Sequence, residues 1–236
     1  MTDISRSPQK IAGMFDAIAG RYDLLNHLLS AGIDKRWRKA AIRSLALTGR
    51  ERVLDLCTGT ADLAIAARAS TPRAARVVGV DFAGAMLRIG QDKLLQGGLA
   101  DRVTLVRGDA SCVPVASGSV DAVTIAFGIR NVERTAAACA EMLRVLKPGG
   151  RIAILEFAIP QSPIIKAGYL FYFNQILPRI GQLVARHQAY AYLPASVGAF
   201  QTPAEFVTLL RQTGFRDVQA QPLTFGIVYL YTAVRG

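Results

Sequence analysis

Two acidic residues stand at the ends of two apolar runs, and a turn of small residues follows the first of them. Asp55 precedes the turn Cys57-Thr58-Gly59-Thr60-Ala61, and Asp81 ends the next apolar run, Val77 to Val80. Small residues let a backbone pass close to a ligand, and the helix after such a turn offers unpaired N–H groups. The carboxylate of Asp81 can accept both hydroxyls of a ribose. The pattern therefore predicts a nucleoside site at the switch point of a parallel sheet.

The composition of the turn bears on which nucleoside is bound. Gly59 is its only glycine, whereas a dinucleotide site usually has the pattern G-x-G-x-x-G around the pyrophosphate. The charge of Asp55 would repel a phosphate, but it suits the ammonium and sulfonium groups of S-adenosyl-L-methionine. We expect S-adenosyl-L-methionine as the cofactor, with Asp55, Gly59 and Asp81 at its site. Another nucleotide, or a structural turn without a ligand, is the alternative.

Length and cysteine usage limit the class of protein. A chain of 236 residues without a linker rich in proline, serine and glycine predicts a single α/β domain. The three cysteines are unevenly spaced and lack a C-x-x-C pair, which indicates a reducing compartment, buried thiols and no metal site. No apolar run has the length of a signal-peptide core at the N-terminus, or the roughly 18 residues of a membrane span. We expect a cytoplasmic protein.

The chain is strongly basic and also apolar. Its net charge is +11, and 51% of its residues are hydrophobic. Nucleic acid or an anionic membrane surface would each suit the charge, and the apolar content favours the membrane. The basic residues are scattered and are not interleaved with aromatic residues, so we expect no nucleic-acid partner. A basic surface without a partner is the alternative.

Hydrophobic periodicity predicts the order of the elements. The spacing over 11–45 is helical with breaks near Gly20 and Gly32, so two or three helices precede the sheet. Strands are expected at 51–57, 76–81, 103–107, 120–126 and 151–157, and helices at 61–70, 84–96 and 133–146. Lys147-Pro148-Gly149-Gly150 ends the last of these helices. A helix at 203–213 and a hairpin of strands 216–222 and 226–234 complete the chain.

This order resembles the Rossmann-like α/β fold of the class I S-adenosylmethionine-dependent methyltransferases, whose seven-stranded sheet has its last strand antiparallel. We divide the single domain into a helical cap, a cofactor-binding core, a substrate- or membrane-facing insertion, and a C-terminal helix with a hairpin, at 1–48, 49–158, 159–202 and 203–236. Ligands of such sheets bind beyond the carboxyl ends of the strands. Asp109, Ala110 and the segment Phe127 to Asn131 are therefore expected at the same crevice as Asp81.

Further segments resemble one family, the ubiquinone and menaquinone biosynthesis C-methyltransferases, over nearly the whole chain. They are Phe15 to Asp23, Phe127-Gly128-Ile129-Arg130-Asn131, Arg144 to Gly150, and Ile176 to Gly181 followed by Tyr192-Leu193-Pro194. The resemblance implies methyl transfer from S-adenosyl-L-methionine to a ring carbon of a polyprenylated quinol. It also implies cofactor contacts at Thr60, Asp81, Asp109 and Ala110.

Two positions depart from the family, and the turn bears on the substrate. Ala126 stands where members often have serine, and Asp34 lies where they have a nearby histidine. The turn begins with Cys57, as in the menaquinone-type members, which favours a polyprenyl naphthoquinol substrate: demethylmenaquinol converted to menaquinol. A dual ubiquinone and menaquinone enzyme, or a small-molecule C-methyltransferase of secondary metabolism, is the alternative.

The implied chemistry needs no metal but needs help with a proton. A ring carbon attacks a methyl group only as the quinol hydroxyl loses its proton, so a base or an anion stabiliser is required. Arg130 is the favoured candidate, because its cation could stabilise the oxyanion or hold a water that takes the proton. A salt bridge with Glu133 or Glu156 is the alternative role for Arg130. Asn131 would orient Arg130 or the substrate.

Residues of the cap and of the insertion are also assigned to the site. Tyr22 and Asp23 would position the cofactor's methionine end or the acceptor ring, or else cap a helix. Aromatic and aliphatic residues of the insertion would line a slot for the ring and tail, unless they are ordinary core: Phe171, Tyr172, Phe173, Ile176, Leu177, Tyr190, Tyr192 and Phe200. Residues 163–186 are expected at the surface of the inner membrane, where the protein would be peripheral. We leave a homodimer open.

Overall fold

The centre of the molecule is a sheet whose middle strands are almost continuously buried. The structure is a computed structural model and describes residues 7–30, 32–70, 76–172, 175 and 188–236. Strands β1 (Arg52–Leu56) and β4 (Val120–Ala126) are buried along nearly their whole lengths. Continuous burial of this kind is typical of parallel strands that are covered on both faces.

The sheet has seven strands in the order β3-β2-β1-β4-β5-β7-β6. Five strands are parallel: β1, β4, β2 (Arg76–Asp81), β3 (Val103–Arg107) and β5 (Leu146–Phe157). Strand β7 (Val228–Arg235) pairs antiparallel with β5 on one side and with β6 (Phe215–Leu223) on the other. The expected fold is therefore confirmed, with the topological switch between β1 and β4.

Helices cover both faces of the sheet. One face packs against α5 (Thr135–Val145) and α9 (Pro203–Thr213), and the other packs against α2 (Asp34–Ser44), α3 (Asp62–Ala69) and α4 (Gly84–Gln96). Neighbouring residues of a strand face opposite ways, so Leu54 belongs to the first core and Val53 to the second. These two cores hold the strand ends in fixed positions.

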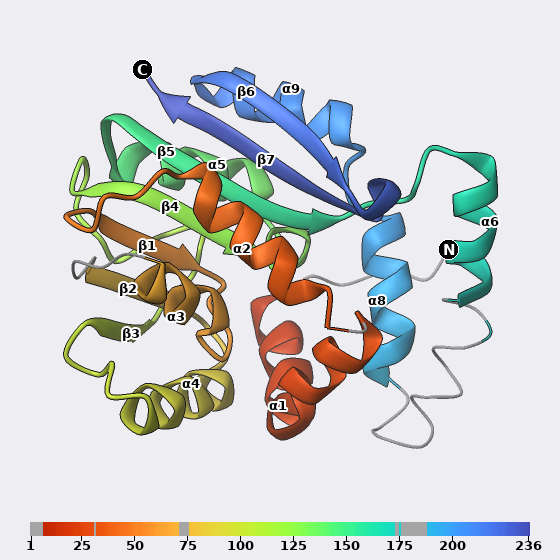
Figure 1. Cartoon of the computed structure of the whole chain (residues 1–236), viewed down its shortest axis with the longest axis horizontal. Coiled ribbons are helices and arrows are strands. Elements are labelled where there is room, and N and C mark those ends of the chain that lie inside the picture. Colours follow the sequence, from red (N-terminus) through yellow and green to blue (C-terminus); the bar gives the residue numbers. More distant parts are fainter. Residues whose placement is uncertain (1–6, 31, 71–75, 173–174, 176–187) are drawn as a thin grey trace.

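Three helices lie beyond the carboxyl ends of the strands. They are α1 (Pro8–Leu29), α6 (Pro163–Phe171) and α8 (Gln188–Gly198), which lie along the bottom and the right-hand side of Figure 1. Helix α1 packs against α4 on one side and against α8 on the other. The cap and the insertion are far apart in the sequence. Together they cover the end of the sheet where ligands of this fold bind.

Three local expectations are wrong. Gly20 does not break the cap, because α1 runs without interruption from Pro8 to Leu29. Contacts of the same helix with α4 at Ala83 and Met86 outweigh the roughly 1 kcal/mol that a glycine costs inside a helix. Lys147 to Gly150 lie within β5 as a register shift against β4, so that strand begins earlier than expected. Cys112 is exposed rather than buried.

Candidate functional site

The turn after β1 has left-handed backbone at three alternate residues. The φ angles are +52° at Cys57, +55° at Gly59 and +67° at Ala61, although only one of the three is a glycine. The turn is tied down by bonds from Thr58 N to Val80 O at 3.1 Å and from Ala61 N to Thr58 O at 2.9 Å. A cysteine and an alanine thus hold the left-handed backbone that glycine adopts most readily, which sequence spacing alone does not reveal.

Asp55 supports this turn from beneath. The hydroxyls of Thr58 and Thr124 each donate to one of its carboxylate oxygens, both at 2.6 Å. Burial raises the pKa of Asp55 from 3.8 to about 6, against the lowering effect of these two bonds. Asp55 is almost fully buried, outside the lining of the two pockets described below. A direct contact with the cofactor remains a prediction.

Asp81 joins the turn to the start of α4. Its two carboxylate oxygens accept from Gly59 N and from Ala83 N, each at 2.8 Å. Burial raises the pKa of this carboxyl group. A carboxylate offers about four acceptor positions, so these bonds leave Asp81 able to accept from ligand hydroxyls as well.

Two pockets adjoin one another at Phe82 and Asn131. The inner pocket is lined by Phe15, Tyr22, Cys57, Gly59, Asp81, Phe82, Ala83, Met86, Ala126, Phe127, Gly128 and Asn131. The outer pocket is lined by Phe82, Asp109, Ala110, Ser111, Asn131, Val132, Glu133 and Arg134. Together they form one crevice across the ends of β1 to β4.

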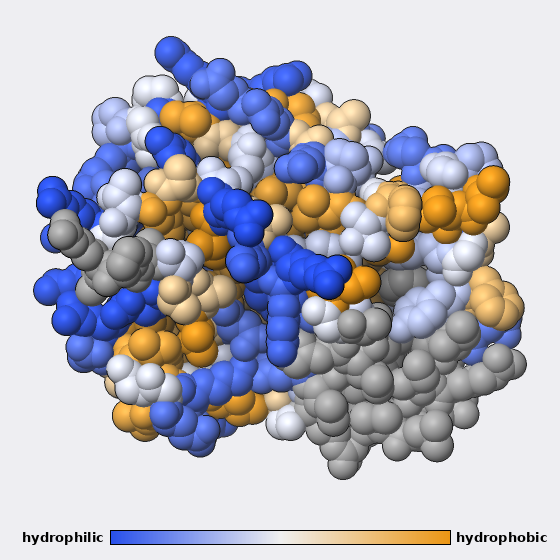
Figure 2. Space-filling view, viewed as in Figure 1, coloured by the Kyte–Doolittle hydropathy of each residue, from blue (hydrophilic) through white to orange (hydrophobic). Residues whose placement is uncertain are grey.

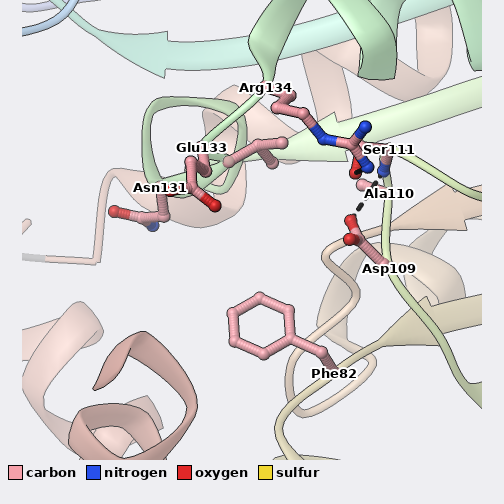
Figure 3. Close-up of a pocket in the computed structure, with 8 residues that line it drawn as sticks. Phe82, Asp109, Ala110, Ser111, Asn131, Glu133 and Arg134 are labelled. Atoms are coloured by element: carbon pink, nitrogen blue, oxygen red, sulfur yellow. Dashed lines mark hydrogen bonds between the residues drawn. The ribbon is translucent and has the colours of Figure 1, made fainter. Parts of the chain in front are cut away.

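The outer pocket presents a ring and a carboxylate to the same space. Figure 3 shows Phe82 facing the open region across from Asn131 and Glu133, with Asp109 at one side. Asp109 accepts from Ser111 N at 2.7 Å, and Arg134 donates to the Ser111 hydroxyl at 3.0 Å. An aromatic wall with a fixed carboxylate at its edge suits a flat base that carries an amino group.

Arg130 is buried and paired. Its Nη1 lies 2.7 Å from Oε1 of Glu156, which is 0% exposed, and its backbone N donates to Oε2 at 3.2 Å. Arg130 also donates to Phe127 O and, at 3.3 Å, to the Ser196 hydroxyl of α8. The Glu156 salt bridge is confirmed, whereas Glu133 lines the outer pocket instead. A role for Arg130 in stabilising an oxyanion remains a prediction.

Asn131 lies at the meeting point of the two pockets, as its proposed role requires. Its side-chain oxygen accepts from the Tyr192 hydroxyl of α8 at 3.0 Å, and its Nδ2 lies 3.5 Å from Phe127 O. The insertion is therefore connected directly to the tip of β4. Of the expected slot residues, Phe200 packs on Phe206 in the core and Phe171 is exposed. Phe173, Ile176 and Leu177 lie outside the described residues, as does the side chain of Tyr190.

An aromatic cluster that sequence spacing did not reveal supports the tip of β4. Phe127, whose φ is +58°, stacks on Phe157 with ring centroids 4.5 Å apart. Trp37 of α2 meets the two rings edge-on at 5.9 and 6.1 Å, and its Nε1 donates to the Thr224 hydroxyl at 2.8 Å. Phe127 also lines the inner pocket, so this cluster sets one wall of the crevice.

The two residues predicted from the cap lie near the crevice, and their roles at the site remain predictions. Tyr22 lines the inner pocket, and Asp23 accepts from the Thr60 hydroxyl at 2.6 Å. Asp23 lies well inside α1, so the alternative that it caps a helix is wrong. Lys93 of α4 pairs with Asp23 at 2.5 Å, a contact that no spacing in the sequence indicated.

The strand order, the single antiparallel strand and a crevice at the switch point are those of the class I S-adenosylmethionine-dependent methyltransferase fold. A crystal structure of a Thermotoga maritima S-adenosylmethionine-dependent methyltransferase, described as a possible histamine N-methyltransferase, has the same fold. Its TM-score is 0.65 at 16% identity, covering 95% of this chain and 99% of that one.

Sequence relatives narrow this class. Residues 3–235 match the ubiE/COQ5 methyltransferase family. The ubiquinone/menaquinone biosynthesis C-methyltransferase UbiE of Syntrophotalea carbinolica is 49% identical over 98% of this chain and 96% of its own. The demethylmenaquinone methyltransferase of Lactiplantibacillus plantarum is 39% identical over 94% of each chain. The chain belongs to the ubiE/COQ5 methyltransferase family.

Proposed function

We propose that this enzyme transfers a methyl group from S-adenosyl-L-methionine to a ring carbon of a polyprenylated naphthoquinol, converting demethylmenaquinol to menaquinol. The observation that carries the proposal is the position of Asn131 in the segment Phe127 to Asn131. Asn131 lines both pockets, so this segment at the tip of β4 borders the place where an acceptor would meet the methyl donor. Full-length likeness to relatives named for quinone biosynthesis supports the same substrate class.

The residues of the crevice fit the cofactor. Asp81 would accept the ribose hydroxyls, Asp109 and Ala110 would contact the adenine, and Gly59 and Thr60 would adjoin the methionine end. The fit rests on the remaining acceptor capacity of the Asp81 carboxylate and on the ring of Phe82 beside Asp109. When bound, S-adenosyl-L-methionine supplies an electrophilic methyl group on a positively charged sulfur.

The chain itself must orient the acceptor and favour its ionised form. In our proposal Asn131 and Tyr22 contact the acceptor ring, because both line the inner pocket. Arg130 supplies positive charge behind the same segment, and Glu156 fixes the direction of its guanidinium. Asp23 acts from the cap by holding Thr60. Apolar walls at Phe15, Met86 and Phe127 would keep water away from the developing anion.

The product of the reaction tests the proposal. The purified protein would be given reduced demethylmenaquinol or its benzoquinol counterpart with methyl-labelled cofactor, and products would be identified by mass. We expect a label on a ring carbon of the naphthoquinol, and none when the same quinone is supplied oxidised, because the oxidised ring is a poor nucleophile. A label on both quinols would indicate the dual enzyme. Cofactor binding without labelling of either quinol would contradict the proposal.

We also propose that the enzyme docks on an anionic membrane surface, where its prenylated substrate resides. Within the described ranges, no helix is long and apolar enough to cross a membrane. Helix α6 leaves Ile164 83% and Phe171 60% exposed, and Phe225 in η3 (Thr224–Gly226) is 78% exposed. Figure 2 shows hydrophobic surface over α6 and hydrophilic surface over α2, whose exposed residues include Lys35 and Arg36. Apolar contact next to positive charge suits an anionic bilayer.

Vesicle flotation tests this docking. We expect the protein to float with vesicles that contain anionic lipid, and an Ile164→Ser/Phe171→Ser variant to remain below. Leu95→Ser is the matched control, because Leu95 is also 60% exposed but lies on α4. Equal flotation of all three proteins would contradict docking through α6. A cytoplasmic location and a homodimer remain predictions.

A further inference from the structure

Lys93 on α4 makes three polar contacts with three other parts of the chain. Its Nζ lies 2.5 Å from Asp23 Oδ2 on α1, 2.7 Å from Asp62 Oδ1 at the start of α3, and 3.0 Å from the Thr60 hydroxyl in the cofactor turn. An ammonium group has three N–H donors. The Lys93 ammonium group can therefore donate one hydrogen bond to each of Asp23, Asp62 and Thr60.

Asp23 and Thr60 complete a closed ring with this lysine. The Thr60 hydroxyl donates to Asp23 Oδ1 at 2.6 Å, so both carboxylate oxygens of Asp23 are engaged. The side chains of Lys93, Asp23 and Asp62 are each 26% exposed, whereas Thr60 is buried. Partly buried groups in a ring constrain one another's positions more than an isolated surface pair does.

The ring fixes how α1 lies over the inner pocket. Helix α1 brings Phe15 and Tyr22 into the pocket wall, and Tyr22 is the residue before Asp23. Among the described side chains, the buried apolar contact between α1 and the start of α4 consists of Ala19, Ala83 and Met86 with partly buried neighbours. A backbone donor of α4 also contacts α1, because Ala85 N donates to the Asp16 carboxylate at 2.8 Å. The ring therefore supplies the polar attachment of α1 on the side of the turn.

The charges around the ring oppose this attachment once the lysine is removed. Asp62 also faces Arg38 at 3.6 Å, and Arg38 pairs with Asp34, so three carboxylates share two cations. Without Lys93, Asp23 and Asp62 would repel each other and push α1 away from the turn. The added negative charge alone would attract a cationic ligand more strongly. Displacement of α1 therefore predicts weaker binding of the cationic cofactor, whereas the added negative charge predicts tighter binding.

We propose that Lys93 is a positioning residue that holds α1 on the cofactor turn through Asp23 and Thr60 and thereby shapes the pocket for S-adenosyl-L-methionine. The inference rests on the cofactor site of the proposed function but not on the identity of the methyl acceptor. Lys93 lies outside both pockets. Its removal is expected to weaken cofactor binding, whereas the loss of its positive charge alone would strengthen it.

Calorimetric titration of the full chain with S-adenosyl-L-methionine tests the proposal. We expect Lys93→Met to weaken binding about tenfold, corresponding to about 1.4 kcal/mol, and Lys93→Arg to recover part of the loss. Lys147→Met is the matched control, since Lys147 pairs with Asp121 at 2.6 Å away from the pockets. An Asp23→Asn/Lys93→Met double variant should bind no more weakly than Lys93→Met, because both changes release the same contact. Unchanged or tighter binding by Lys93→Met would overturn the proposal.

Hydrogen exchange supplies a readout that needs no ligand. Backbone amides of α1 should exchange about tenfold faster in Lys93→Met than in the unaltered protein or in Lys147→Met, because release of α1 exposes its amides more often. Unchanged exchange in α1 would overturn the proposal even if cofactor binding were altered. A protein that binds the cofactor and shows the expected exchange, yet methylates no quinol, would contradict only the proposed substrate.

Discussion

Gly128 has room for no side chain, and this makes a sharp test of how the crevice is assembled. A Cβ at this position would lie 2.3 Å from the Cβ of Cys57 and 3.0 Å from its Sγ. Carbon atoms in contact normally lie about 3.5–4.0 Å apart. In Gly128→Ala the segment after β4 and the turn after β1 must therefore separate by about 1 Å. Both line the inner pocket, so the cofactor site should open.

The size of the effect follows from overpacking. Forcing a methyl group into a filled space costs about 1–3 kcal/mol, and we expect cofactor affinity to fall by about 10–100-fold. Titration calorimetry would measure the affinity, and urea denaturation the free energy of unfolding. Gly13→Ala is the control, because no atom lies within 4 Å of the added Cβ.

A second substitution should rescue the first. Cys57→Gly removes both atoms that clash with the new methyl group, and glycine readily adopts the φ of +52° found there. The double variant Cys57→Gly/Gly128→Ala should therefore bind the cofactor within about threefold of the unaltered protein, since only the shared clash is relieved. Normal binding by Gly128→Ala alone, or no recovery in the double variant, would refute this account of the contact.

Three further substitutions test the acidic and basic residues. Asp81→Asn should weaken cofactor binding by about 2 kcal/mol in calorimetry, because one of two charged acceptors becomes a donor; undiminished affinity would remove Asp81 from the site. The folded-state pKa of Asp55, raised from 3.8 to about 6, means that its contribution favours folding at low pH and is lost as pH rises through 6. Urea denaturation should therefore show Asp55→Asn gaining about 2 kcal/mol over the unaltered protein between about pH 4 and pH 7; a constant difference would argue against the raised pKa. Arg130→Ala should leave Glu156 buried and unpaired, and this should lower the free energy of unfolding by about 3–5 kcal/mol. We expect turnover to fall by about 10²-fold while cofactor affinity stays near normal. Equal losses of turnover and affinity would place Arg130 in the cofactor site.

The sequence was sufficient for the strands and their order along the chain, because apolar runs and turn residues are local signals. The arrangement of these strands in the sheet was expected only from the resemblance to the methyltransferase fold. The strand ending at Asp81 and the helix at 84–96 have the bounds that the pattern predicts. The hairpin around residues 224–226 is likewise where the turn residues indicate. Glycine was less reliable, since Gly20 is accommodated inside α1 by tertiary contacts that no local window contains.

Most polar partners within the site could not be read from spacing. Glu156 was one of two candidate partners for Arg130, 26 positions away, but nothing indicated that Lys93 meets Asp23, 70 positions away. Such pairs meet only because the strand ends and the covering helices converge, which depends on packing of the whole chain. The left-handed conformation of Cys57 and Ala61 was hidden for another reason: these residue types rarely adopt it, and surrounding bonds impose it here.

Trp37 is the only tryptophan of the chain, and it touches the wall of the crevice through Phe127. All tryptophan fluorescence of the chain therefore comes from Trp37, which lies next to the segment that a bound ligand would contact. Emission recorded during rapid mixing could follow cofactor arrival in real time without any attached dye. Because the indole also bonds to Thr224, the same signal would register movement of the C-terminal hairpin tip.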